Sequence, residues 1–171
     1  MKTLSCILLI LLSISGFSQG KKVALVIGNS DYHYGGVLRN PVNDALMMKK
    51  VLNQVGFEVV EYYNLDEERM RMAVEDFGQR LNNFQTGLFF YAGHGIQVKG
   101  NNYLIPVDVN LTSENDVENN CIKADWVLDI MKDADNETNI VILDACRNNP
   151  FESSWTNSQQ GKGLAQLEAP V

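Results

Sequence analysis

The chain has 171 residues, of which 45% are hydrophobic and 20% are charged. These values are typical of one globular domain with a hydrophobic core, and they exclude a disordered tail, a collagen-like fibre and a small disulfide-stapled fold. The 14 basic and 21 acidic residues give a formal net charge of −7, so binding of nucleic acid through phosphate neutralisation is not expected.

The N-terminal segment 1–18 is predicted to be a secretory signal peptide. Lys2 supplies a short positive region, an apolar run follows over residues 4–14, and Gly16 and Ser18 are the small residues expected before a cleavage site. The run is too short to span a bilayer. Cleavage after Ser18 would export the chain, without a membrane span, to the periplasm, the cell surface or the medium. A retained N-terminal anchor is the alternative.

Strands and helices are predicted to alternate after this segment. Residues 23–27 form a continuous apolar run, as in a parallel strand that is covered on both faces. Asn40 and Pro41 predict the N-cap and first residue of a helix, which ends at Gly56. A second strand is expected over residues 57–63.

Asp66 is placed to cap the second helix, whose apolar stripe continues to Phe84. A third strand is predicted over residues 88–92, and a small hairpin is expected around residues 100–102. The remaining predicted elements are a polar loop over residues 108–120, a third helix over residues 124–131 and a last strand over residues 140–143.

This order predicts an α/β fold, with a doubly wound, mainly parallel sheet and helices on both faces. We expect residues 19–151 to form the domain and residues 152–171 a polar linker or tail. No later strand in the sequence covers the outer edge of the strand at 140–143. An uncovered edge is a liability, so we expect a sheet that is incomplete on its C-terminal side. A longer precursor, a second subunit or another copy of the chain would complete it.

Ligands bind such sheets beyond the carboxyl ends of the strands, where loops containing His94 and Cys146 are expected to meet. A thiol attacks a carbonyl group as the thiolate, and a nearby imidazole can hold the proton. Backbone N–H groups beside Gly95 could face the developing oxyanion. A single His or Cys after a strand is more often structural, but Gly-His-Gly together with Asp-Ala-Cys is more specific.

Residues 91–95 (Tyr-Ala-Gly-His-Gly) and 144–147 (Asp-Ala-Cys-Arg) resemble segments of the caspase-like cysteine peptidases, nearer to the metacaspase-like branch. The histidine lies 52 residues before the cysteine (146 − 94 = 52), which fits the known caspase pattern of about 50. Residues 29–32 and 38–44 resemble the first loop and helix start of the same family. The resemblance covers residues 21–171.

The resemblance implies a cysteine endopeptidase. Cys146 would be the nucleophile and His94 the general acid and base, and the backbone N–H groups of Gly95 and Cys146 would bind the oxyanion. It places Asp31 and Asp144 in the pocket for the residue before the scissile bond, where two carboxylates suit Arg or Lys. We therefore expect cleavage after Arg or Lys. Alternatively, Asp31 is a turn residue and Asp144 a strand-end cap.

The rival hypothesis is a caspase-fold binding or scaffold module without activity. The absence of the family's second half favours that hypothesis, whereas the intact pair of His94 and Cys146 argues against it. Protein or peptide substrates are expected as partners, and no metal or other cofactor is expected. The acidic residues of segment 108–120 lack calcium-loop spacing, so the sequence gives calcium dependence no support. Lys162 is the expected site of self-cleavage, and Cys121 is expected to pack as a small apolar residue.

Overall fold

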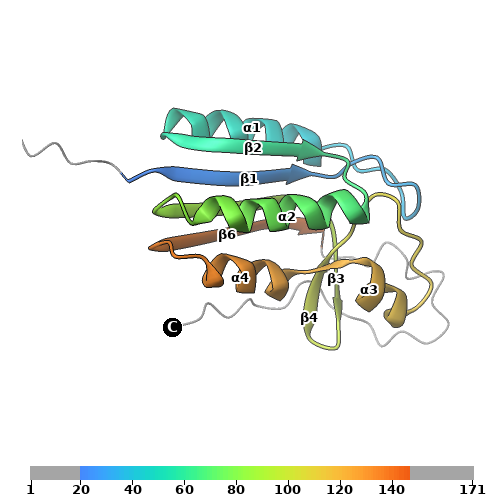
Figure 1. The fold of residues 1–171 in the computed structure, drawn as a ribbon. Coiled ribbons are helices and arrows are strands. Elements are labelled where there is room, and N and C mark those ends of the chain that lie inside the picture. Colours follow the sequence, from blue (N-terminus) through green and yellow to red (C-terminus); the bar gives the residue numbers. More distant parts are fainter. Residues whose placement is uncertain (1–19, 147–171) are drawn as a thin grey trace, which may run out of the picture.

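The computed structural model of the chain describes residues 20–146. The predicted signal peptide, the predicted tail at 152–171 and Lys162 lie outside these residues. Within them, six strands and four helices alternate along the chain (Figure 1). None of the helices in this described part is long and apolar enough to cross a membrane.

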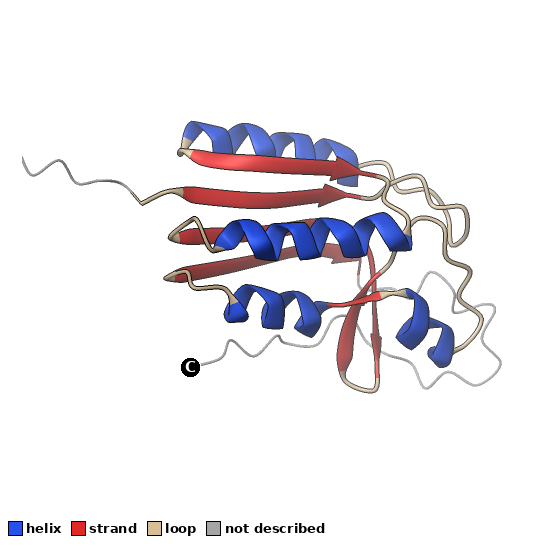
Figure 2. Cartoon of the chain, in the orientation of Figure 1, coloured by secondary structure: helices blue, strands red, loops and turns tan. Residues whose placement is uncertain are grey.

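The strands build one mixed sheet (Figure 2), which confirms the predicted α/β fold class. Four strands run parallel in the order β2-β1-β3-β6. The second half of β3 pairs antiparallel with β4, which in turn pairs with β5. The strands are β1 (Lys22–Gly28), β2 (Phe57–Tyr63), β3 (Thr86–Val98), β4 (Asn101–Leu104), β5 (Ile122–Lys123) and β6 (Thr138–Cys146).

Helices cover both faces of the parallel part, as expected from the sequence. The helices are α1 (Pro41–Gln54), α2 (Glu67–Leu81), α3 (Glu114–Asn120) and α4 (Ala124–Asp133). Ala45 and Leu52 of α1 pack with Val26 and Phe90 on one face. The cluster on the other face joins α2 and α4 to β1 and β3, with Phe77 at its centre. Because β1 is buried on both faces, its sequence is a continuous apolar run.

The predicted helix boundaries at Asn40, Gly56 and Asp66 are confirmed, but one of the N-cap residues makes no side-chain bond. The Asp66 carboxylate accepts the N–H of Arg69 at 2.8 Å and caps α2. Gly56 follows α1 with φ 85°, a conformation that favours glycine. Asn40 is the N-cap residue and Pro41 the first residue of α1, as predicted, but the Asn40 side chain makes no capping bond. Ser30 Oγ, from the loop after β1, accepts the N–H of Val42 at 3.3 Å instead.

Three other elements differ from the prediction. Strand β3 does not end at residue 92, because β6 and then β4 continue to supply hydrogen-bonding partners as far as Val98. Strand β6 likewise extends to Cys146. The segment 108–120 is not all loop, because it contains α3, whose first turn is capped by Ser113 accepting the N–H of Asp116 at 3.2 Å.

Candidate active site

The structure brings the two predicted catalytic residues together at the end of the parallel ladder between β3 and β6. Strands β3 and β6 pair in parallel over nine positions, and the last of these pairs is His94 with Cys146. Adjacent strands lie about 4.8 Å apart, so the two backbones are direct neighbours. For Cys146 the structure describes the backbone and not the side chain. The backbones of His94 and Cys146 therefore lie side by side in two strands rather than in two loops.

The imidazole of His94 is buried, with 5% of the residue exposed. Its Nε2 lies 3.2 Å from the carbonyl oxygen of Gly36. A carbonyl oxygen can only accept, so this contact assigns the ring proton to Nε2 and leaves a lone pair on Nδ1. Nδ1 is buried and has no hydrogen-bond partner among residues 20–146. Burial lowers the pKa of His94, and the bond to Gly36 opposes this shift only in part. The ring is thus neutral at neutral pH and offers one free acceptor.

The carbonyl of Gly36 is a functional group that the sequence did not reveal. Gly35 and Gly36 have φ values of 79° and 90°, a region in which L side chains are strained. Both glycines lie in the loop after β1, and the carbonyl of the second one contacts the imidazole of His94. The only sequence signal was the Gly-Gly pair within a polar loop. A backbone acceptor therefore orients the His94 ring through Nε2.

The backbone N–H of Gly95 points toward β6. Gly95 is opposite Leu104 in the antiparallel ladder with β4, and Ile105 N–H donates to His94 O at 3.0 Å. Hydrogen-bonded and non-hydrogen-bonded pairs alternate along an antiparallel ladder, and the bond from Ile105 makes His94 and Ile105 a hydrogen-bonded pair. Gly95 and Leu104 are then a non-hydrogen-bonded pair, so the Gly95 N–H faces away from β4. On its other side lies β6, whose ladder with β3 ends at Cys146. The N–H group thus faces the region next to Cys146.

Asp31 and Asp144 lie at the same end of the sheet, but the structure does not join them. Asp31 is exposed in the loop after β1, and its Oδ2 accepts the Asn64 side-chain N–H at 2.7 Å. Asn64 Oδ1 in turn accepts the backbone N–H groups of Ser30 and Asp31. Asp144 is exposed on β6 and pairs in register with Ala92, on the sheet face that α1 covers. Asp144 is therefore not at the end of its strand.

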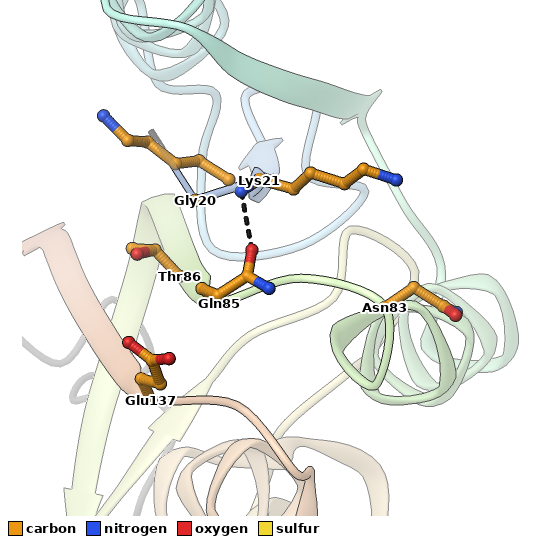
Figure 3. A pocket seen from close by; sticks show the side chains of 7 residues that line it. Gly20, Lys21, Asn83, Gln85, Thr86 and Glu137 are labelled. Carbon is orange, nitrogen blue, oxygen red and sulfur yellow. Dashed lines mark hydrogen bonds between the residues drawn. The ribbon is translucent and has the colours of Figure 1, made fainter. Parts of the chain in front are cut away.

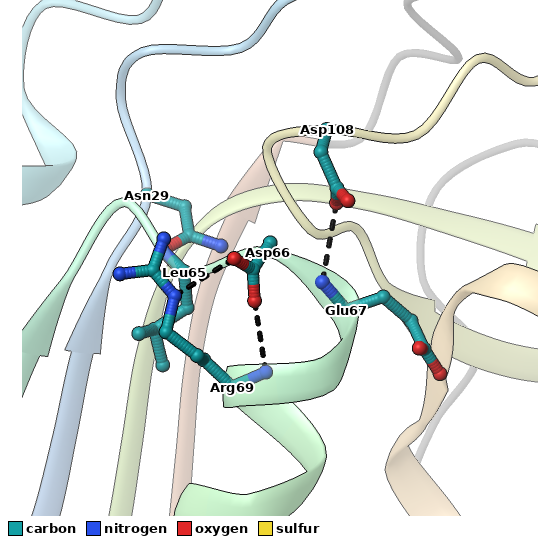
Figure 4. Close-up of polar contacts among 6 residues, drawn as sticks. All are labelled: Asn29, Leu65, Asp66, Glu67, Arg69 and Asp108. Atoms are coloured by element: carbon teal, nitrogen blue, oxygen red, sulfur yellow. Dashed lines mark hydrogen bonds and ion pairs between the residues drawn. The ribbon is translucent and has the colours of Figure 1, made fainter.

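A buried asparagine ties the loops of this end of the sheet together. Asn29 is fully buried; its Oδ1 accepts the N–H of Leu65 at 3.0 Å and its side-chain N–H donates to Ile105 O at 3.3 Å. Beside it, Asp108 accepts the N–H of Glu67 at 3.1 Å (Figure 4). These bonds connect the segments that follow β1, β2 and β4. Sequence reasoning placed Asn29 in a family-like loop without assigning it a role.

Cys121 packs as predicted. It is buried in the cluster that contains Ile96, Val98 and Val117. Burial raises the pKa of its thiol to about 12, so the group stays protonated and is a poor nucleophile. Cys121 is therefore a structural cysteine.

Two further features of the described residues concern metal binding and a surface hollow. Within residues 20–146, no three His, Cys, Asp or Glu side chains are grouped so that they could hold a metal ion. A surface hollow lies at the opposite end of the sheet, near the starts of β1 and β3 (Figure 3). Its lining residues are Gly20, Lys21, Lys22, Asn83, Gln85, Thr86 and Glu137.

Comparisons with known proteins identify the family of the chain. The caspase domain family matches residues 21–169 of the chain. Human mucosa-associated lymphoid tissue lymphoma translocation protein 1 is 36% identical over 126 residues, and its mouse homologue is 35% identical over 126 residues. Each match covers 74% of this chain but 15% of the relative, so the chain corresponds to a small part of those proteins. The extent of the family match shows that the chain belongs to the caspase domain family.

Proposed function

We propose that this caspase-family chain is a cysteine endopeptidase in which Cys146 and His94 form the catalytic pair. One observation carries the proposal. His94 pairs in register with Cys146, and its imidazole is neutral, buried and oriented, with an acceptor nitrogen that no described residue occupies. A buried imidazole that keeps a free lone pair next to a thiol is the arrangement that general-base activation of a nucleophile needs.

The chemistry follows from these groups. Nδ1 of His94 takes the thiol proton of Cys146, and the resulting imidazolium keeps its Nε2 proton on the Gly36 carbonyl. The thiolate attacks the substrate carbonyl carbon, and backbone N–H groups beside Cys146 stabilise the oxyanion. His94 then returns the proton to the leaving amine as the C–N bond breaks, leaving a thioester on Cys146. Water activated by His94 hydrolyses this thioester and regenerates the thiol.

For specificity, we infer a preference for Arg or Lys before the scissile bond. Gly28, Ala92 and Asp144 occupy one row across β1, β3 and β6. Two strand spacings separate Gly28 from Asp144, which is about 10 Å. Asp31 follows Gly28 by three residues, so both carboxylates belong to the same end of the sheet. Asn64 orients one oxygen of Asp31, and a guanidinium or ammonium group suits the remaining negative charge.

The test is cleavage of fluorogenic peptides that end in Arg, Lys or Asp, with a reductant and with either calcium or a chelator. Cleavage after Arg or Lys should be lost in Cys146→Ala and retained in Cys121→Ala, the matched control for removal of a thiol. Asp144→Asn should raise KM for the Arg peptide more than for an uncharged one. Cleavage after Asp would keep the peptidase and refute the acidic pocket.

The same assay addresses the partner that we propose for β6. Within residues 20–146, β6 pairs with β3 alone, and Ile140 on it is 37% exposed. An apolar edge strand is a surface for another strand, from a second copy or a second subunit. Activity that rises with chain concentration would support a second copy. If neither the chain alone nor the chain with a separately supplied second half cleaves any peptide, the proposed activity is refuted and a binding module remains.

A further inference from the structure

A tyrosine hydroxyl occupies the place of a missing strand beside His94. Strand β1 pairs with β3 only as far as Gly28 and Ala92, and Asn29 N–H donates to Ala92 O at 2.9 Å. The next backbone N–H on this side of β3 belongs to His94, and no strand reaches it. The Tyr32 hydroxyl accepts this N–H at 2.7 Å. Tyr32 therefore satisfies a buried donor at the point where β3 changes partners.

The hydroxyl groups of Tyr32 and Tyr91 form a closed circuit on His94. Tyr91 Oη lies 2.8 Å from His94 O and 3.0 Å from Ile105 O, and both are acceptors. A hydroxyl has one proton, so the Tyr91 hydroxyl donates it to these carbonyl oxygens. The proton between the two hydroxyls, which are 3.2 Å apart, then comes from Tyr32. The circuit runs from His94 N–H through both tyrosines to His94 C=O.

Tyr32 also contacts the imidazole itself. The two ring centroids are 4.4 Å apart, and the ring planes are inclined at 53°. The imidazole thus lies between the Tyr32 ring and the Gly36 carbonyl, both of which belong to the loop after β1. Gly93 leaves the space for this arrangement, because a Cβ there would lie 2.5 Å from Tyr32 Oη and 2.6 Å from Tyr91 Oη.

We propose that Tyr32 is a positioning residue for His94, which it holds by the peptide N–H and by the ring, with Tyr91 closing the circuit. The proposal rests on the proposed function, in which His94 exchanges a proton with Cys146. A general base contributes only while its acceptor atom stays within reach of the proton it takes. Small displacements of such a group reduce the rate strongly. Tyr32 fixes the backbone and the ring of His94 at once.

The test uses Tyr32→Phe in the full chain, with Tyr103→Phe as the matched control. Phenylalanine keeps the ring contact and removes the acceptor of the His94 N–H. Tyr103 is a buried tyrosine of the same core cluster as Tyr32. In Tyr32→Phe, the His94 amide should exchange with deuterium about tenfold faster or more, because its hydrogen bond is lost. Iodoacetamide should modify Cys146 about tenfold more slowly at pH 7, with an altered pH profile. Tyr103→Phe should change neither rate by more than about twofold.

These two rates need no substrate, so they separate this proposal from the proposed function. If wild-type Cys146 reacts quickly and no peptide is cleaved, the positioning role is still tested while the peptidase is not supported. Where peptides are cleaved, Tyr32→Phe should lower kcat and leave KM nearly unchanged. Unchanged exchange and alkylation rates in a folded Tyr32→Phe chain would overturn the proposal. If that variant does not fold, Tyr91→Phe must still slow the alkylation at least about twofold, and an unchanged rate would overturn it equally.

Discussion

Replacing Gly93 by alanine tests the hydroxyl circuit through stability alone. The φ of Gly93 is not positive, so alanine can adopt its backbone conformation and the cost comes from contacts. The new Cβ would meet Tyr32 Oη at 2.5 Å and Tyr91 Oη at 2.6 Å. Overpacking of this kind costs about 1–3 kcal/mol. Displacing the two hydroxyls weakens two hydrogen bonds, worth about 1 kcal/mol each. We expect Gly93→Ala to lower the free energy of unfolding by about 2–4 kcal/mol.

A double-mutant cycle with Tyr32→Phe identifies the cause. Tyr32→Phe alone leaves the buried His94 N–H unpaired, which costs about 1–3 kcal/mol. In the double variant, the Tyr32 hydroxyl, which would lie nearest to the new Cβ, is absent. The loss of its hydrogen bond with the His94 N–H then contributes only once to the destabilisation. The double variant should therefore be more stable than the sum of the single changes by about 1 kcal/mol or more. Urea unfolding followed by circular dichroism gives all four free energies, with m values that should stay constant.

Gly87→Ala is the matched control on the same strand. Its Cβ would meet a Leu81 methyl group at 2.3 Å and Asn139 Oδ1 at 3.0 Å, and neither tyrosine hydroxyl is among its nearest neighbours. Gly87 lies six residues before Gly93, so its effect should add to that of Tyr32→Phe within about 0.5 kcal/mol. The circuit would be refuted if Gly93→Ala left the free energy of unfolding nearly unchanged. It would also be refuted if the destabilisation by Gly93→Ala simply added to that of Tyr32→Phe, as we expect for Gly87→Ala.

Two further predictions follow from the pKa shifts. Burial lowers the pKa of His94 below the usual 6.5, so the unfolded chain binds a proton there more readily than the folded one. The stability that the neutral ring contributes is complete above pH 6.5 and is lost as the pH falls through the lower folded pKa. Urea unfolding at pH 7.5 and 5.5 should show this loss, and His94→Gln should reduce it. Because burial raises the pKa of Cys121 to about 12, a thiol reagent at pH 8 should label Cys121 only after unfolding, as peptide mass spectrometry can show.

The elements that were predicted well carry their signals within a few consecutive residues. The apolar run at 23–27 is buried on both faces of β1, and Asp66 caps α2 through its own side chain. Boundaries that depend on distant partners were predicted less well. β3 continues through His94 because β6 and β4 offer backbone partners there, and nothing near residue 94 in the sequence encodes those partners. Asn40 lies at the N-cap as predicted, but the side chain that accepts the Val42 N–H belongs to Ser30, in the loop after β1.

The candidate site divides in the same way. That His94 and Cys146 would be neighbours followed from strand order alone, since carboxyl ends of adjacent parallel strands meet at one edge. The groups that orient His94 did not follow. The Gly36 acceptor is a backbone carbonyl, which every residue has, so residue type gives it no signature. Tyr32 belonged to a family-like segment, but its hydroxyl meets the His94 N–H only because the loop folds back over β3.

The balance of contacts around His94 bears on the choice between an enzyme and a binding module. The tyrosine hydroxyls bond the backbone N–H and C=O of residue 94 and not its side chain. They would therefore stabilise this part of β3 equally well if another residue type stood at position 94. The imidazole adds one bond to Gly36 and leaves Nδ1 buried without a partner among the described residues. A buried polar atom without a partner costs about 1–3 kcal/mol, which an apolar side chain would avoid. An Nδ1 without a partner in residues 20–146 is unfavourable for the folding of that part and suits a group that takes a proton from a thiol. This asymmetry favours the peptidase over the scaffold.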